Sequence, residues 1–135
     1  NINNSKNIYI NNYGDENLKH LRSKDFANLL NGIYSAVPKL IEKIHFDPEH
    51  PENSNIKITN KKLPHIQVKK DDIWEIEDKN TFLEALVNDK YFMLEDYIED
   101  IDIIDKFREK YNNNIKLLKT LKKTELIIIN KSKNI

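Results

Sequence analysis

The stretch IKITNKKLPHIQVKKDDIWEI, residues 56–76, decides the fold class of this chain. Three short runs in it alternate apolar with polar residues: Ile56 and Ile58, Ile66 and Val68, Trp74 and Ile76. Such period-two alternation is typical of half-buried strands, because successive side chains of a strand point to opposite faces of the sheet. Polar turns at residues 60–64 and 69–72 separate the runs. We therefore predict a three-stranded antiparallel β-meander with one buried face.

A long acidic helical region is predicted directly after the third run. Thr81 and Glu84 have the spacing of a capping box, in which each side chain accepts a hydrogen bond from the other residue's backbone amide. Apolar residues then continue at three- and four-residue steps as far as Tyr111, with an irregularity expected near residues 88–89. Asn112-Asn113-Asn114 interrupts this pattern, and a basic C-terminal helix is expected to follow it.

Two shorter helices are predicted before the strands. Ser23 is placed to cap the first helix, which carries Phe26 and Leu29 on one face. In the second helix, four apolar residues fall at i, i+3, i+4 and i+7, so that one stripe faces the core: Val37, Leu40, Ile41 and Ile44. We expect the two helices to form an N-terminal hairpin. The predicted fold class is therefore α+β, with this hairpin preceding the meander, the acidic helix and the basic helix.

A single domain is predicted, with a boundary near each end of the chain. Residues 1–12 repeat Asn and Ile, which indicates a low-complexity linker that ends in a short strand at Ile8 and Ile10. Residues 13–130 form the α+β domain, and residues 131–135 form a polar tail. Because the chain has 135 residues and no apolar run that could span a membrane, we expect a soluble fragment of a larger protein with one core.

Composition excludes several classes of function. The chain has no cysteine, which rules out disulfides and thiolate metal sites and favours an intracellular location. It has only two glycines and no glycine-rich phosphate loop, and no nucleophilic triad is evident. We therefore expect a domain without catalytic residues or a cofactor. The net charge of zero hides a polarity, since residues 71–105 carry 13 acidic and two basic side chains, whereas residues 106–135 carry two and nine.

The loop between residues 45 and 55 is the main candidate for binding. It brings together side chains that could bind a ligand or a docking partner: His45, Asp47, His50, Glu52, Asn53 and Asn55. If the loop bound a divalent metal, His45 and His50 would be the candidate ligands, although three ligands must converge to form a site. The alternative is a structural loop, in which His45 ends a helix and Asx turns flank the two prolines.

Two further functions remain open as alternatives. His45, followed by Asn53-x-Asn55 and a strand, loosely resembles the HNH endonucleases, which implies a metal-dependent nuclease with His45 as general base. In that family the following helix supplies a metal ligand, but the predicted helix from Thr81 contains no histidine. The second alternative is nucleic-acid binding, in which lysines of the basic helix neutralise phosphates: Lys116, Lys119, Lys122 and Lys123.

The order of these segments resembles an uncharacterised C-terminal domain of giant DNA virus (mimivirus-like) proteins, which often follows C2H2 zinc fingers and coiled-coil segments. The resemblance rests on INNYGDEN at residues 10–17, on the helix at residues 37–44, on IHFDPEHPENSNI at residues 44–56, and on Trp74. It implies a virus-encoded assembly module that binds itself or a protein partner in the host cytoplasm, the viral factory or the virion. Nucleic acid would be reached through upstream modules or the basic helix.

Overall fold

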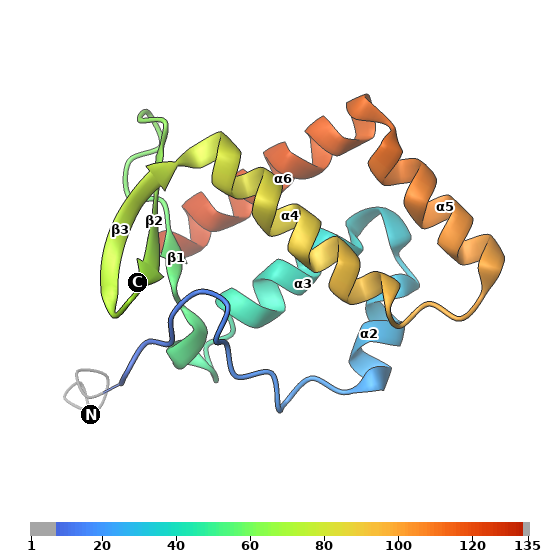
Figure 1. Cartoon of the computed structure of the whole chain (residues 1–135), viewed down its shortest axis with the longest axis horizontal. Coiled ribbons are helices and arrows are strands. Elements are labelled where there is room, and N and C mark those ends of the chain that lie inside the picture. The colour runs from blue at the N-terminus through green and yellow to red at the C-terminus, as the bar shows by residue number, and fades with distance from the viewer. Residues whose placement is uncertain (1–7, 134–135) are drawn as a thin grey trace.

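The computed structural model describes residues 8–133, which form a three-stranded sheet and five α-helices (Figure 1). The predicted α+β class is confirmed. In chain order the elements are α2 (Ser23–Leu30), η1 (Ile33–Ser35), α3 (Ala36–His45), η2 (Pro51–Asn53), β1 (Ile56–Lys57), β2 (His65–Lys70), β3 (Ile73–Asp78), α4 (Lys79–Glu95), α5 (Ile101–Asn112) and α6 (Asn114–Ser132). The sheet lies at one end of the molecule, and α5 lies at the other (Figure 1). None of these helices is long and apolar enough to cross a membrane.

Helix α3 lies at the centre of the core. Its predicted apolar stripe is confirmed, because Val37, Leu40, Ile41 and Ile44 are all fully buried. Helices α4 and α6 pack against α3 and against each other, and the sheet adds buried residues from β1 and β2. Burial of each such aliphatic side chain stabilises the fold by roughly 1.5–3 kcal/mol. The core is therefore built from segments far apart in the sequence.

The sheet is the predicted antiparallel meander, in the order β1-β2-β3, but its third strand faces the opposite way from the prediction. In β3, the positions opposite the buried Ile66 and Val68 are occupied by glutamates, because a two-residue turn pairs Lys70 with Ile73. Trp74 and Ile76 consequently lie on the outer face, where Ile76 is 66% exposed. Trp74 is half-buried instead under the Lys57 ammonium, which lies 4.1 Å from the ring centroid.

The predicted N-caps Ser23 and Thr81 are wrong, because in both α2 and α4 the N-cap residue lies further upstream. Helix α4 begins at Lys79, and the Asp78 carboxylate caps it by accepting hydrogen bonds from the amide and the hydroxyl of Thr81. Helix α2 has Arg22 at its N-cap, so Ser23 is its first helical residue. The Asp25 carboxylate accepts a hydrogen bond from the Arg22 amide at 2.8 Å. In both helices a carboxylate provides the acceptor.

The predicted long helical region is two helices. Helix α4 continues without interruption through residues 88–89, where an irregularity was expected, and the break falls at residues 96–100. Asp100 caps α5 by accepting from the Asp102 amide at 2.8 Å. The predicted interruption at residues 112–114 is confirmed, since Asn113 caps α6 through the Ile115 amide. Helix α6 continues through Ser132, two residues into the segment that was expected to be a tail.

The N-terminal segment lies along η2 and the sheet without forming the predicted short strand. Residues 8–12 have no strand, and residues 1–7 of the predicted linker lie outside the described residues. The Asn11 amide donates to the Glu52 carbonyl, and the Tyr13 amide donates to the Lys69 carbonyl, each at 2.8 Å. A turn follows at Gly14, with a φ of +98° that favours glycine. Isolated hydrogen bonds therefore replace a strand ladder here.

Candidate functional site

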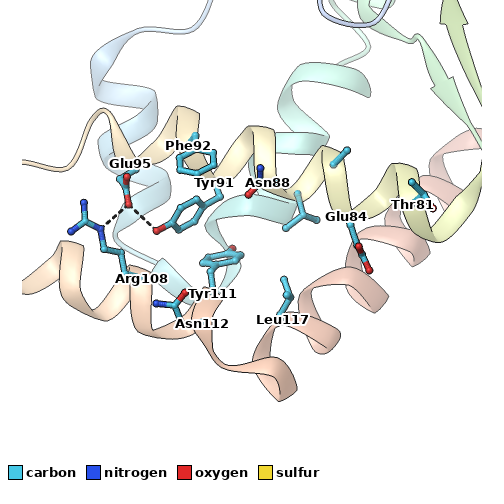
Figure 2. Close-up of a pocket in the computed structure, with 12 residues that line it drawn as sticks. Thr81, Glu84, Asn88, Tyr91, Phe92, Glu95, Arg108, Tyr111, Asn112 and Leu117 are labelled. Carbon is cyan, nitrogen blue, oxygen red and sulfur yellow. Dashed lines mark hydrogen bonds and ion pairs between the residues drawn. The ribbon is translucent and has the colours of Figure 1, made fainter.

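A groove of about 810 Å³ lies between α4 and the α5–α6 pair (Figure 2). We call it the α4 groove. Its central lining is aromatic and aliphatic: Ala85, Val87, Tyr91, Phe92, Tyr111 and Leu117. Polar side chains, among them Glu84, Asn88, Glu95 and Arg108, complete it. Mixed linings and volumes of this order are typical of sites that bind a ligand or a partner side chain.

Stacked aromatic rings form one side of the α4 groove. The Tyr91 ring lies parallel to Phe107, with 4.8 Å between centroids and 12° between planes, and Phe107 is fully buried. Tyr111 and Phe92 pack on the same Tyr91 ring, with centroids 4.8 and 5.1 Å away. Aromatic pairs of this kind contribute about 0.5–1.5 kcal/mol beyond their buried area. Because Phe92 is 53% exposed, this cluster presents an apolar surface to solvent.

An ion pair between Glu95 and Arg108 lies at one end of the α4 groove, as Figure 2 shows. Glu95 accepts hydrogen bonds from the Tyr91 hydroxyl at 2.8 Å and from Arg108 Nε at 3.0 Å. Burial, followed by the Glu95 hydrogen bond, raises the pKa of Tyr91 to about 12. The hydrogen bond from Arg108 lowers the pKa of Glu95 below its usual value. Tyr91 is thus neutral and Glu95 ionised at neutral pH, and the three side chains join α4 to α5.

An exposed apolar stripe lies on α6 beside this groove. Ile115 and Leu118 are 67% and 65% exposed, and Leu126 continues the stripe two turns further along the helix. Leu118 also lines a smaller hollow between α4 and α6 that shares Glu84 with the α4 groove. We call Ile115, Leu118 and Leu126 the α6 stripe. Leu118 therefore brings the stripe to the edge of the groove, whereas Ile115 and Leu126 lie about 180–200° around α6 from Leu117, which lines the groove.

The buried part of the candidate loop is a hydrogen-bonded network around His45. The His45 ring is fully buried at the end of α3, and its Nδ1 lies 2.8 Å from Asn55 Oδ1. Asn55 in turn donates to the Glu16 carboxylate at 2.6 Å. Burial, followed by the charge of Lys90, lowers the pKa of His45 to about 3, so this histidine is neutral. A general base must reach its substrate, so burial removes the support that His45 gave to the nuclease hypothesis.

Asn53 joins the loop to the N-terminal segment. Its side chain is fully buried and makes two hydrogen bonds of 2.8 Å to Asn17, one accepted from the backbone amide and one donated to the carbonyl. The side-chain amide of Asn53 thus bonds both the N–H and the C=O of Asn17, as the backbone of a neighbouring β-strand would. Together with Asn55, Asn53 has a structural role in holding residues 11–17, whereas Asp47, His50 and Glu52 lie at the surface.

The surface part of the loop contains His50, Asp47 and Glu52. The His50 ring stacks on His20, with 3.6 Å between centroids and 13° between planes. His50 Nδ1 lies 3.1 Å from Glu52 Oε2. Ligand atoms of His20, Asp47 and His50 all lie within 4.8 Å of one another. The structure thus brings three of the candidate residues together with His20, and it places His45 in the core instead.

The basic candidates of α6 lie on two different faces. Lys116, Lys119 and Lys123 line one hollow of about 220 Å³ with Lys110 and Tyr34, which we call the lysine pocket. The Lys110 ammonium donates to the Tyr34 carbonyl. Burial, followed by the charges of Lys123 and Lys116, lowers the pKa of Lys110 to about 8. Lys122 instead lies beside Leu118 and Glu125, so it does not belong to this pocket.

Sequence patterns missed the residues that complete these clusters. His20 lies 30 residues from His50, and Tyr34 lies 76 residues from Lys110, so no local spacing connects all the members of each cluster. The one available signal was residue type, since His20 is one of four histidines in the chain. No protein-family model matches the chain, and neither does any curated protein or solved structure.

Proposed function

We propose that this domain is a non-enzymatic self-association module, in which the α4 groove of one copy receives the α6 stripe of a second copy. The observation that carries this proposal is that Leu118 of an exposed apolar stripe lies at the edge of an apolar groove. A surface with both features is self-complementary under a two-fold axis, so each copy donates its stripe and receives its partner's. The occupant of the groove is therefore Ile115 and Leu118 of a second copy.

Charge supports the same arrangement. Helix α4 lies in the acidic part of the chain, whereas α6 lies in the basic part. A two-fold arrangement places Lys122 of one α6, next to Leu118, near α4 of the other copy. Such complementarity improves orientation and association rate more than it improves affinity. The apolar stripe supplies the larger contribution, since full burial of one aliphatic side chain is worth roughly 1.5–3 kcal/mol.

Association is expected to depend on the α6 stripe and to be insensitive to an equally exposed residue elsewhere. We expect I115E and L118E each to weaken self-association at least about tenfold, because a charged side chain cannot be buried in an apolar groove without a partner. Ile76 on β3 is 66% exposed, almost the same as Ile115, so I76E is the matched control. Sedimentation equilibrium across a concentration series measures all three variants and the wild type.

The wild type should form a concentration-dependent dimer. A wild type that stayed monomeric at high concentration would contradict self-association. Equal effects of I76E and I115E would instead show that any exposed apolar residue drives the association. If the wild type is monomeric but its groove captures an amphipathic helix of another protein, the docking function remains and the self-association proposal is wrong.

The resemblance to the viral C-terminal domain extends this proposal to a biological context. Residues 10–17 and 44–56, which carry that resemblance, are the segments joined by Asn53 and Asn55. Under this proposal the domain assembles copies of a larger virus-encoded protein inside the host cell, in its cytoplasm or in the viral factory. Other modules of that protein would bind nucleic acid or further partners.

The lysine pocket favours a second candidate function, the binding of nucleic-acid phosphates. Its described lining contains four lysines and no carboxylate. Four neutralised phosphates would give a slope of about −3 for log affinity against log salt with single-stranded nucleic acid. We expect K119A to reduce this slope by about 1. K122A is the matched control, since Lys122 is on the same helix outside the pocket. Fluorescence anisotropy at several salt concentrations would measure both, and equal slopes for K119A and K122A would exclude the pocket.

A further inference from the structure

The surface cluster beside η2 has the composition of a metal site. His20, Asp47 and His50 each offer one ligand atom, and the three atoms lie within 4.8 Å of one another. Tetrahedral Zn²⁺ holds nitrogen and oxygen ligands at about 2.0–2.2 Å, which places neighbouring ligand atoms roughly 3.3 Å apart. To direct both nitrogens at one ion, the His20 and His50 rings would tilt out of their parallel stack. All three residues are partly exposed.

The His20 ring provides a second, independent observation. Both of its nitrogens are shielded by surrounding atoms, and neither has a hydrogen-bond partner among the residues that the structure describes. A buried polar atom without a partner costs about 1–3 kcal/mol. The ring also stacks directly on His50, which holds the two imidazoles together. An ion bound by both imidazoles would give one of the His20 nitrogens the partner that the described residues do not provide.

Glu52 orients His50, the other histidine of the cluster. His50 Nδ1 faces Glu52 Oε2 at 3.1 Å, and the same oxygen accepts a hydrogen bond from Asn17 Nδ2 at 3.1 Å. This contact with a carboxylate oxygen favours the His50 tautomer that carries its proton on Nδ1 and its lone pair on Nε2. A metal-binding histidine usually donates the N–H of its other ring nitrogen to such a carboxylate, to a backbone carbonyl or to water.

We propose that His20, Asp47 and His50 bind a divalent transition-metal ion of the Zn²⁺ class, with Glu52 as the positioning residue. Two imidazoles and one carboxylate suit this class better than Ca²⁺ or Mg²⁺, which prefer oxygen ligands alone. Three protein ligands leave one tetrahedral position for water or for a group from a partner. The ion would link the segment around His20 to the loop around His50, next to the hydrogen bonds that Asn53 makes.

The test uses untagged wild-type protein with Zn²⁺ or Co²⁺ alone. Titration calorimetry should show saturable binding of one ion per chain. In ¹H–¹⁵N spectra of the imidazoles, Zn²⁺ should shift the signals of His20 and His50 and leave those of His45 and His65 unchanged. Loss of a residue that hydrogen-bonds to a metal ligand typically weakens metal binding about 10–100-fold, which is the effect expected for E52Q. H20Q and H50Q remove direct ligands and should weaken binding by more than about 100-fold.

H65Q is the control, because His65 is an exposed histidine on β2, outside the cluster. It should bind Zn²⁺ with wild-type affinity. Circular dichroism identifies any variant that fails to fold, and the wild-type imidazole spectra decide the question in that case. The proposal is overturned if wild-type protein shows no saturable binding, if H20Q binds as tightly as the wild type, or if the ion shifts the His65 signals instead of those of His20 and His50.

Discussion

Lowering the pH from 7 to 5 is expected to reduce the free energy of unfolding by about 2 kcal/mol through His45 alone. Burial and then Lys90 lower the pKa of this side chain from 6.5 to about 3 in the folded protein. The unfolded chain therefore binds more protons than the folded chain between these two values. Stability is full above pH 6.5 and falls as the pH decreases, reaching a loss of roughly 4 kcal/mol near pH 3.

Urea denaturation at pH 7, 6 and 5 measures this effect before most carboxylates are protonated. Asp72 and Asp78 have lowered pKa values in the folded protein, so any stability that they contribute is lost mainly below this range. H45Q removes the titrating group and should show a much flatter dependence between pH 7 and 5. H65Q, which changes an exposed histidine, should keep the wild-type dependence. A wild type as stable at pH 5 as at pH 7 would rule out a buried neutral His45.

N53A is expected to lower the free energy of unfolding by about 2–4 kcal/mol, because the substitution leaves two backbone groups without partners. Asn53 is fully buried, and its amide makes both hydrogen bonds to the backbone of Asn17. The loss should also increase hydrogen exchange at the Asn17 amide, since the segment from Asn11 to Asn17 would open locally. Equilibrium denaturation and hydrogen exchange measure the two effects.

N60A is the matched control for N53A. Asn60 is exposed in the loop between β1 and β2, and its side chain accepts one local hydrogen bond from the Lys62 amide at 3.0 Å. We expect N60A to change the free energy of unfolding by less than about 1 kcal/mol. Equal effects of N53A and N60A would mean that the contact with Asn17 does not stabilise the fold.

Local patterns in the sequence were enough to predict the elements that form the core. The apolar stripe from Val37 to Ile44 predicted one buried face of a helix, and the alternation in residues 56–76 predicted the meander. Residues 112–114 correctly predicted a helix boundary, because an asparagine side chain competes with the backbone for hydrogen bonds. Each of these features depends on residues within one or two turns or strands, which is the range over which periodicity carries information.

Tertiary structure alone decided which side chains meet. The register between β2 and β3 turned Trp74 and Ile76 outward, since a two-residue turn fixed the pairing that alternation left open. The fold also separated His45 from His50 and joined His50 to His20, which lies 30 residues earlier. Composition and spacing thus determined the elements and the candidate residues of this protein. The packing of segments distant in sequence determined their partners, because contacts in the folded chain depend on distance in space.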